Sequence, residues 1–278
     1  MKRVFVLILL YALLYITLML FGVVHPTLFS LWIIPIGILI SSLAMSSGIA
    51  GAAFWFPVFL VFHLDPKLAS WIALCAMFFG FGSGLIKHYR QRTMSWDIIQ
   101  RYLYTAILGG MIGSMLFGHI DSYGIIVIFG IFLILFGGKM FFSPPQPQTH
   151  TLWISQTLAL VGGILKGLVS IGIEIIITDS LNSKQDHEKI VGSVVVVVFV
   201  VNLFVLITRL LVDHDLVFML QRDGASILDM MLLIIPSVII GGQLGPLIVK
   251  KMSRETLIRY VSILLMIVGS LVLLKVNG

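Results

Sequence analysis

The sequence predicts an all-α, polytopic integral membrane protein, and composition, segment length and charge distribution each support this fold class. Of its 278 residues, 59% are hydrophobic and only 11% are charged, whereas a soluble domain carries about 25% charged residues. Apolar segments of transmembrane length recur along the chain, and basic residues gather in the loops between them. This composition argues against a secreted domain, a nucleic-acid-binding protein and an ordinary cytosolic enzyme. The net charge of +6 is therefore attributed to loops that set membrane orientation.

The first apolar segment, residues 4–24, is predicted to be a retained transmembrane helix. It is longer than the apolar core of a signal peptide, and no small-x-small cleavage site follows it. A crossing needs about 20 apolar residues. Further segments follow in order at residues 31–63, 67–87, 99–120, 123–142, 152–181, 189–212, 227–249 and 257–275.

Two of these segments, 31–63 and 152–181, are too long for a single crossing. As one straight helix the first would be ~50 Å long, well beyond a ~30 Å hydrocarbon core. Small or polar residues interrupt each segment near its middle, at 46–52 and at 167–172. Glycine lowers helix propensity. We therefore expect two glycine-broken helical hairpins, each returning to the side of the membrane on which it starts.

Basic residues give the segments a direction. Lys2 and Arg3 place the N-terminus in the cytoplasm. A basic cluster follows the segment 67–87 and consists of Lys87, Arg90, Arg92 and Arg101. If 31–63 is a hairpin, the crossing at 67–87 returns this cluster to the cytoplasm. If 31–63 is a single crossing, the cluster lies outside the cell, against the positive-inside rule. The same count places the C-terminus outside. Arg209, near the outer end of its segment, is expected to extend its charged group to the membrane surface.

Weak internal similarity divides the chain into two repeats. After an N-terminal transmembrane helix (1–27), the first repeat covers 28–143, a Pro-rich cytoplasmic linker covers 144–150, and the second repeat covers 151–278. Each repeat has one broken hairpin and three further spans, and an odd number of crossings makes the two repeats opposite in orientation. Inverted-topology repeats with discontinuous helices are typical of secondary transporters, which bind substrate near the midplane.

Two glycine pairs occupy matching places in the two repeats. Gly109 and Gly113 in the first correspond to Gly241 and Gly245 in the second. A spacing of four residues puts both members of a pair on one helix face, where they allow close approach of a neighbouring helix. We expect these glycines to serve helix packing.

The glycine-rich tracts resemble those of the TauE/SafE family of sulfite exporters. The tract at 47–52 (Ser-Gly-Ile-Ala-Gly-Ala), followed by Pro57, is close to the family's tract and downstream proline. The tract at 167–174 (Gly-Leu-Val-Ser-Ile-Gly-Ile-Glu) is similar, but Glu174 replaces a small residue and Asp179 replaces the proline. The resemblance covers roughly residues 31–275. It implies transport of sulfur-containing anions, such as sulfite or organosulfonates, across the cytoplasmic membrane.

Three ionisable residues lie inside the second hairpin, namely Lys166, Glu174 and Asp179. Such groups cost about 2.5–3.5 kcal/mol each on insertion scales, so they tend to be functional. We predict that Lys166 attracts the substrate and that Glu174, with Asp179 as a further candidate, binds and releases a coupling proton. The alternatives are a structural ion pair between Lys166 and Glu174 and, for Asp179, a cap near the cytoplasmic surface.

The breaks in the two hairpins are predicted to bind the anion. A helix N-terminus carries free N–H groups and about +0.5 charge, which suit an anion. The candidate substrate-binding residues are Ser47, Gly48, Ala50, Gly51, Lys166, Ser170 and Gly172. The alternative is that the small residues only allow tight packing. Asn202 and Gln243, polar residues in apolar segments, are candidates to line the transport path, and interhelical hydrogen bonding explains them as well.

Together these features predict a secondary transporter of small anions that uses the proton gradient. No Gly-x-x-x-x-Gly-Lys-Ser/Thr motif occurs, so ATP is not the evident energy source. The sequence suggests no catalytic residue, cofactor or metal site. The expected partners are the anion, protons and the lipid of the cell membrane, with no nucleic acid, and a homo-oligomer is left open. The alternatives are an intramembrane enzyme, for which no nucleophile–base pair is evident, and a non-transporting accessory subunit.

Overall fold

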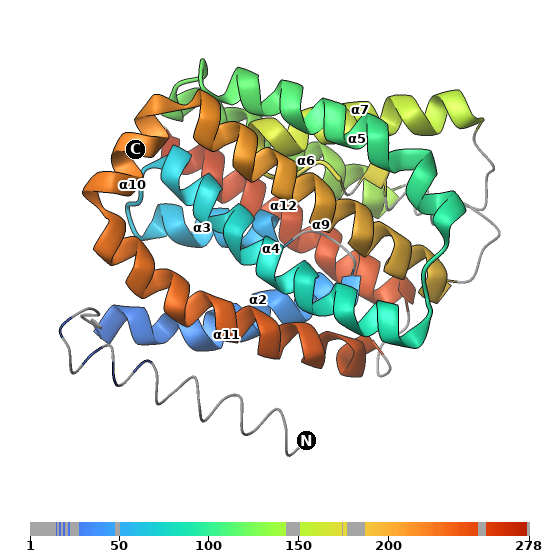
Figure 1. Cartoon of the computed structure of the whole chain (residues 1–278), viewed down its shortest axis with the longest axis horizontal. Coiled ribbons are helices and arrows are strands. Elements are labelled where there is room, and N and C mark those ends of the chain that lie inside the picture. The colour runs from blue at the N-terminus through green and yellow to red at the C-terminus, as the bar shows by residue number, and fades with distance from the viewer. Residues whose placement is uncertain are drawn as a thin grey trace.

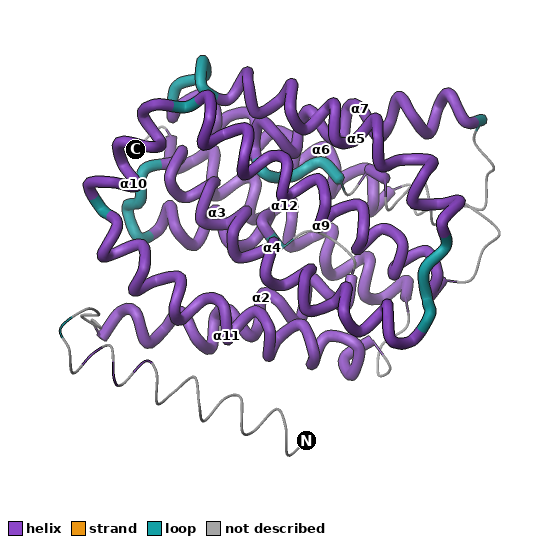
Figure 2. Tube along the Cα trace, viewed as in Figure 1, coloured by secondary structure: helices purple, strands orange, loops and turns teal. Residues whose placement is uncertain are grey.

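The structure is a computed structural model that describes residues 15, 17, 19, 22, 28–47, 51–142, 151–173, 175–176, 187–249 and 254–276. Within these residues every regular element is a helix, and the helices lie side by side in one bundle (Figures 1 and 2). The predicted all-α class is therefore confirmed for the described part of the chain. Most of the N-terminal segment and the whole linker 144–150 lie outside it.

The bundle is built from helices that match the apolar segments of the sequence. In chain order they are α2 (Leu28–Ser47), α3 (Ala52–Val61), α4 (Pro66–Gln91), α5 (Trp96–Phe117), α6 (Ser122–Phe142), α7 (Leu152–Val169), α9 (His187–Val212), α10 (His214–Arg222), α11 (Gly224–Val249) and α12 (Arg254–Val276). Five of them are long and apolar enough to cross a membrane, namely Pro66–Gln91, Ser122–Phe142, Leu152–Val169, Lys189–Val212 and Gly224–Leu244. Helices suit this setting because all their backbone hydrogen bonds are internal.

Aspartates begin two of the helices. Asp65 accepts hydrogen bonds from the N–H groups of Lys67 and Leu68, at 2.8 and 3.4 Å, and so caps α4. Asp213 accepts from the Leu216 N–H at 3.1 Å and starts α10, a short helix between α9 and α11. The start of α4, the ends of α5, α7 and α9, and α10 all lie at one end of the bundle (Figure 1, left). We refer to it as the α10 end, and the sequence predicts that it faces outward.

Small residues bring α5 and α7 into close contact along their length. A Cβ atom added to Gly109 would collide with the backbone of Leu160, and one added to Gly113 would collide with that of Ile164. The contacts advance in step along both helices, so α5 and α7 run parallel. The prediction that this glycine pair serves close packing is confirmed.

The pair α2 and α11 is packed in the same way. A Cβ atom on Gly37 would collide with Ser237, and one on Gly241 would lie 2.5 Å from the backbone oxygen of Ile38. These contacts also advance in step, so α2 and α11 run parallel. Each hairpin's first helix therefore packs against a helix from the other half of the chain.

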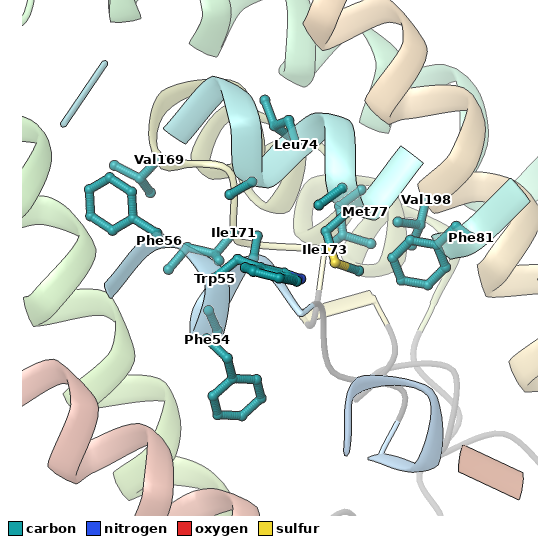
Figure 3. Close-up of a cluster of buried hydrophobic side chains, with 14 of the residues drawn as sticks. Phe54, Trp55, Phe56, Leu74, Met77, Phe81, Val169, Ile171, Ile173 and Val198 are labelled. Carbon is teal, nitrogen blue, oxygen red and sulfur yellow. The ribbon is translucent and has the colours of Figure 1, made fainter. Parts of the chain in front are cut away.

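Two further pairs hold the bundle together, and both are antiparallel. Gly130 of α6 lies against Gly269 of α12, while Gly137 lies against Ser262, earlier in α12. In the α4–α9 pair, the rings of Phe78 and Phe199 stack with centroids 4.6 Å apart. The α4–α9 interface continues into a cluster of buried apolar side chains contributed by α3, α4, α9 and the segment after α7 (Figure 3).

The structure contains both predicted helix breaks. In the first hairpin, α2 ends at Ser47 and α3 begins at Ala52, as the tract at 46–52 predicts. In the second, α7 continues through Gly167 and ends at Val169, so the break begins three residues later than predicted. Gly167 stays helical because it packs directly on α5, against Gly110 and Ser114.

Candidate functional site

The chain reverses sharply where α7 ends. Ser170 has φ +66°, and its N–H donates to the Lys166 carbonyl at 3.0 Å, which closes the last turn of the helix. Gly172 has φ +139°, and a Cβ there would lie 2.6 Å from that of Leu165. Ser170 and Gly172 therefore fold the segment 170–173 back along α7, toward the middle of the bundle.

Lys166 lies fully buried in the last turn of α7. Its Nζ donates to the Ser170 carbonyl oxygen at 2.8 Å. The last four carbonyls of a helix lack intrahelical partners, and a cation near them is favourable. Lys166 thus stabilises the end of the broken helix from inside the protein.

Arg209 of α9 points into the protein rather than toward the membrane surface. Its side chain is fully buried. Nε and Nη2 donate to the Gly167 carbonyl at 3.1 and 2.7 Å, and Nη1 donates to the Ser70 hydroxyl at 2.9 Å. The Phe117 ring lies over the guanidinium at 3.7 Å. The prediction that Arg209 reaches the surface is wrong, because the carbonyls at the end of α7 and the Ser70 hydroxyl provide its partners internally.

Two serines complete this group. The hydroxyl oxygens of Ser70 and Ser170 lie 2.6 Å apart, and the Ser170 hydroxyl lies 3.1 Å from the Ser70 carbonyl, to which it can donate. We call Ser70, Lys166, Ser170 and Arg209 the cationic cluster. Within the described part of the chain, no carboxylate lies within 4.0 Å of Arg209. The described partners of its guanidinium are a carbonyl and a hydroxyl, both neutral.

A second group of charges covers the cluster at the α10 end. Lys67 is buried and forms ion pairs with Asp213 at 3.4 Å and with exposed Asp215 at 3.5 Å. The Lys67 ammonium also lies 5.9 Å from the centroid of Phe117, the ring that contacts Arg209. Phe117 therefore lies beside both the outer ion pairs and the cationic cluster.

Arg222 and Asp223 form a separate, exposed pair between α10 and α11. Arg222 Nε and Nη2 donate to the two carboxylate oxygens of Asp223 at 3.0 and 2.8 Å. These hydrogen bonds hold the pKa of Asp223 below its ordinary value. The pair lies in solvent and is not part of the cationic cluster.

The other predicted site residues are distributed unevenly. Gly51 is buried at the start of α3, where an added Cβ would lie 2.8 Å from Met77 Sδ. Asn202 is fully buried in α9, and in the described part of the chain neither side-chain atom has a hydrogen-bond partner. Gln243 is exposed on α11. Ser47 is the last residue of α2. The positions outside the described residues are Gly48, Ala50, Glu174 and Asp179.

Sequence reasoning missed Arg209, Ser70 and Trp55 as site residues. Arg209 stands three residues before the end of α9, where a surface position fits equally well. Ser70 carries no signal, since a lone serine is common in transmembrane helices. Trp55 follows the glycine tract, but only the fold shows that its indole is fully buried and that Nε1 has no partner among the described residues.

This arrangement can bind an anion. A guanidinium presents planar N–H donors that match two oxygens of an oxyanion, and one serine hydroxyl can add a further donor. Among the described residues, no group of three His, Cys, Asp or Glu side chains could hold a metal ion.

Comparison with known proteins adds one match. A family model described as Sulfite exporter TauE/SafE matches residues 33–272. The matched range contains both glycine tracts, the cationic cluster and Trp55. No curated protein and no solved structure matches the chain.

Proposed function

The chain belongs to the sulfite exporter TauE/SafE family, and from this premise we propose that it is a secondary transporter of a small sulfur-containing anion. Sulfite and organosulfonates are the proposed substrate class, and the cell membrane is the proposed location. Membership of a transporter family, together with several helices of membrane-spanning length, favours this function over an enzyme.

The observation that carries the proposal is the cationic cluster. Placing an arginine inside a membrane segment costs about 2.5–3.5 kcal/mol on insertion scales. Arg209 has five N–H donors. Its hydrogen bonds to Gly167 and Ser70 use one N–H of each of its three nitrogens, Nε, Nη1 and Nη2. One N–H on Nη1 and one on Nη2 are therefore available to an anion in the described structure. The competing explanation is that Arg209 and Lys166 only cap the end of α7.

Asn202 supports a polar path through the bundle. It stands seven residues before Arg209 in α9, so the two side chains lie on nearly the same face, about 10 Å apart along the helix. A buried amide without partners costs free energy unless something else binds it. An anion or its water moving inward from the cationic cluster would give Asn202 the missing hydrogen bonds.

We also propose that the two halves of the chain are inverted repeats. The correspondence pairs α2 with α7, α4 with α9, α5 with α11 and α6 with α12. If each helix is replaced by its counterpart in the other half, the α5–α7 contact becomes the α11–α2 contact, and both of these pairs are parallel. The same replacement turns the α4–α9 and α6–α12 contacts into themselves. In addition, α2 begins at the α10 end, whereas α7 begins at the opposite end (Figure 1).

Orientation in the membrane belongs to the same proposal, with the N-terminus in the cytoplasm and the C-terminus outside. Single cysteines at Ser95 and Asp223, introduced in a Cys75→Ala background, should react with an impermeant reagent from opposite sides. Labelling of both from the same side would contradict the proposed topology. An oligomer remains compatible with this arrangement.

Proton coupling is proposed for Glu174, with Asp179 as a second carrier. The test is sulfite flux in proteoliposomes of the full-length protein, with and without an imposed pH gradient. The gradient should accelerate flux in the wild type, and Glu174→Gln should lose that acceleration. Wild-type flux in Glu174→Gln under the gradient would refute the coupling. A wild type that moves neither sulfite nor methanesulfonate would refute the transport function and favour an accessory subunit.

A further inference from the structure

Among the described residues, the N–H groups at the start of α3 have no hydrogen-bond partner and lie in the interior. Gly51 precedes the helix and provides no capping side chain. Within the described part of the chain, the first N–H groups of this helix to form hydrogen bonds are those of Phe54 and Trp55, which donate to the Gly51 carbonyl at 3.0 and 2.9 Å. The N–H groups of Ala52 and Ala53 come before these bonds, and both residues are buried. This helix start therefore combines free donors with a partial positive charge.

Trp55 provides a second and independent sign of a ligand at this place. Its side chain is fully buried, yet its indole Nε1 has no hydrogen-bond partner among the described residues. Buried tryptophan N–H groups usually find an acceptor, because an unpaired buried donor costs free energy.

The indole is oriented toward the helix start. In Figure 3 the nitrogen-bearing end of the Trp55 ring faces Ile173 and Met77. Met77 in turn packs against Gly51, the residue that precedes α3. Ile173 belongs to the segment that folds back from the cationic cluster. The first hairpin and the segment after α7 therefore both contribute to the buried cluster that contains Trp55.

The depth of this place suits a transport site. Helix α3 has ten residues, so its start lies about 15 Å from its end. That end leads into Asp65, which accepts a hydrogen bond from Ser122 at 3.2 Å at the α10 end of the bundle. About 15 Å is half of a ~30 Å hydrocarbon core. The start of α3 therefore lies near the midplane, deeper than the cationic cluster.

We propose that the Trp55 indole N–H and the first N–H groups of α3 form a second anion-binding site, which holds an oxygen of the substrate midway through the membrane. This inference rests on the proposed transport function and adds a specificity-determining residue to it. An oxyanion accepts the indole hydrogen bond, whereas an ion without such an acceptor gains nothing from it. The competing role for Trp55 is packing alone, since its ring stacks on Phe59 at 5.2 Å.

The experiment removes the N–H of residue 55 in two ways, one of which keeps the bicyclic ring shape. Full-length wild-type protein and Trp55→Phe are compared in proteoliposomes for the KM and maximal rate of sulfite flux, and in detergent for thermal stability. A third variant carries benzothienylalanine at position 55, which keeps the bicyclic shape with sulfur in place of N–H. Trp32→Phe is the matched control, because Trp32 is exposed on α2.

We expect the benzothienylalanine variant to raise KM about tenfold, corresponding to about 1.4 kcal/mol, at unchanged thermal stability. Trp55→Phe should raise KM as well, but at a lower thermal stability, because the smaller ring leaves a cavity at a fully buried position. Trp32→Phe should match the wild type. A benzothienylalanine variant with the KM of the wild type would overturn the role of Trp55 and leave the transport function standing, even if Trp55→Phe fails to fold. A wild type without sulfite flux would overturn both.

Discussion

Replacing Arg209 by glutamine tests the cationic cluster directly. The variant keeps a polar side chain but loses the positive charge and the planar fork of donors. In the structure that fork spans the Gly167 carbonyl and the Ser70 hydroxyl through three hydrogen bonds of 2.7–3.1 Å. Arg209→Gln therefore removes the group proposed to capture the anion while the surrounding helices keep their other contacts.

The size of the effect follows from these contacts. A hydrogen bond to a charged group contributes about 1.5–3 kcal/mol, so losing one to the anion predicts a KM about 10- to 100-fold higher. The Gly167 carbonyl also loses its donors, which costs about 1–3 kcal/mol of stability. Removing a buried cation offsets part of that cost. Arg209→Lys keeps the charge without the fork and should fall between the two proteins.

The assay measures KM for sulfite flux in proteoliposomes beside thermal stability in detergent. Arg222→Gln is the matched control, because it makes the same chemical change at an exposed arginine paired with Asp223. Its KM should equal that of the wild type. If Arg209→Gln unfolds at a lower temperature but keeps the wild-type KM, Arg209 is only a cap for α7 and the proposed capture site is wrong.

Two further predictions concern the scaffold. Gly113→Ala adds a Cβ that collides with the backbone of Ile164, so it should destabilise the protein by about 1–3 kcal/mol in thermal unfolding. Gly138→Ala is the control, because the space beside Gly138 is open, and it should leave the stability unchanged. Equal stability of the two variants would contradict the close packing of α5 on α7. Asp213→Asn leaves Lys67 without its buried partner and should lower the free energy of unfolding by about 3–5 kcal/mol. Asp215→Asn removes an exposed partner and should lower it by less than about 1 kcal/mol. Equal losses of stability in the two variants would contradict the greater contribution assigned to the buried pair.

Much of the fold could be predicted because lipid restricts what a chain can do. Backbone groups in a membrane must find partners within the same segment, so an apolar run of sufficient length becomes a helix. The predicted segments accordingly match α4, α5, α6, α9, α11 and α12. Length also revealed the first break, because α2 and α3 together exceed one crossing.

The site was less predictable, since its residues depend on neighbours that sequence does not identify. Gly167 is helical because α5 packs against it, although glycine alone favours a break. Arg209 turns inward because the end of α7 offers carbonyl acceptors beside it. An arginine one turn from a helix end otherwise reaches water easily. Trp55 was counted as apolar, and only the fold reveals its unpaired N–H.

The two breaks present opposite helix ends to a substrate, and this difference suggests an order of binding. Helix α7 ends with about −0.5 charge, whereas α3 begins with about +0.5. Arg209 carries a full positive charge and has no carboxylate within 4.0 Å among the described residues, so capping α7 leaves surplus positive charge within the cationic cluster itself. At α3 the anion meets only partial charges and the Trp55 N–H. Transport requires release as well as capture, and weaker binding at the midplane lets an anion captured at Arg209 move on.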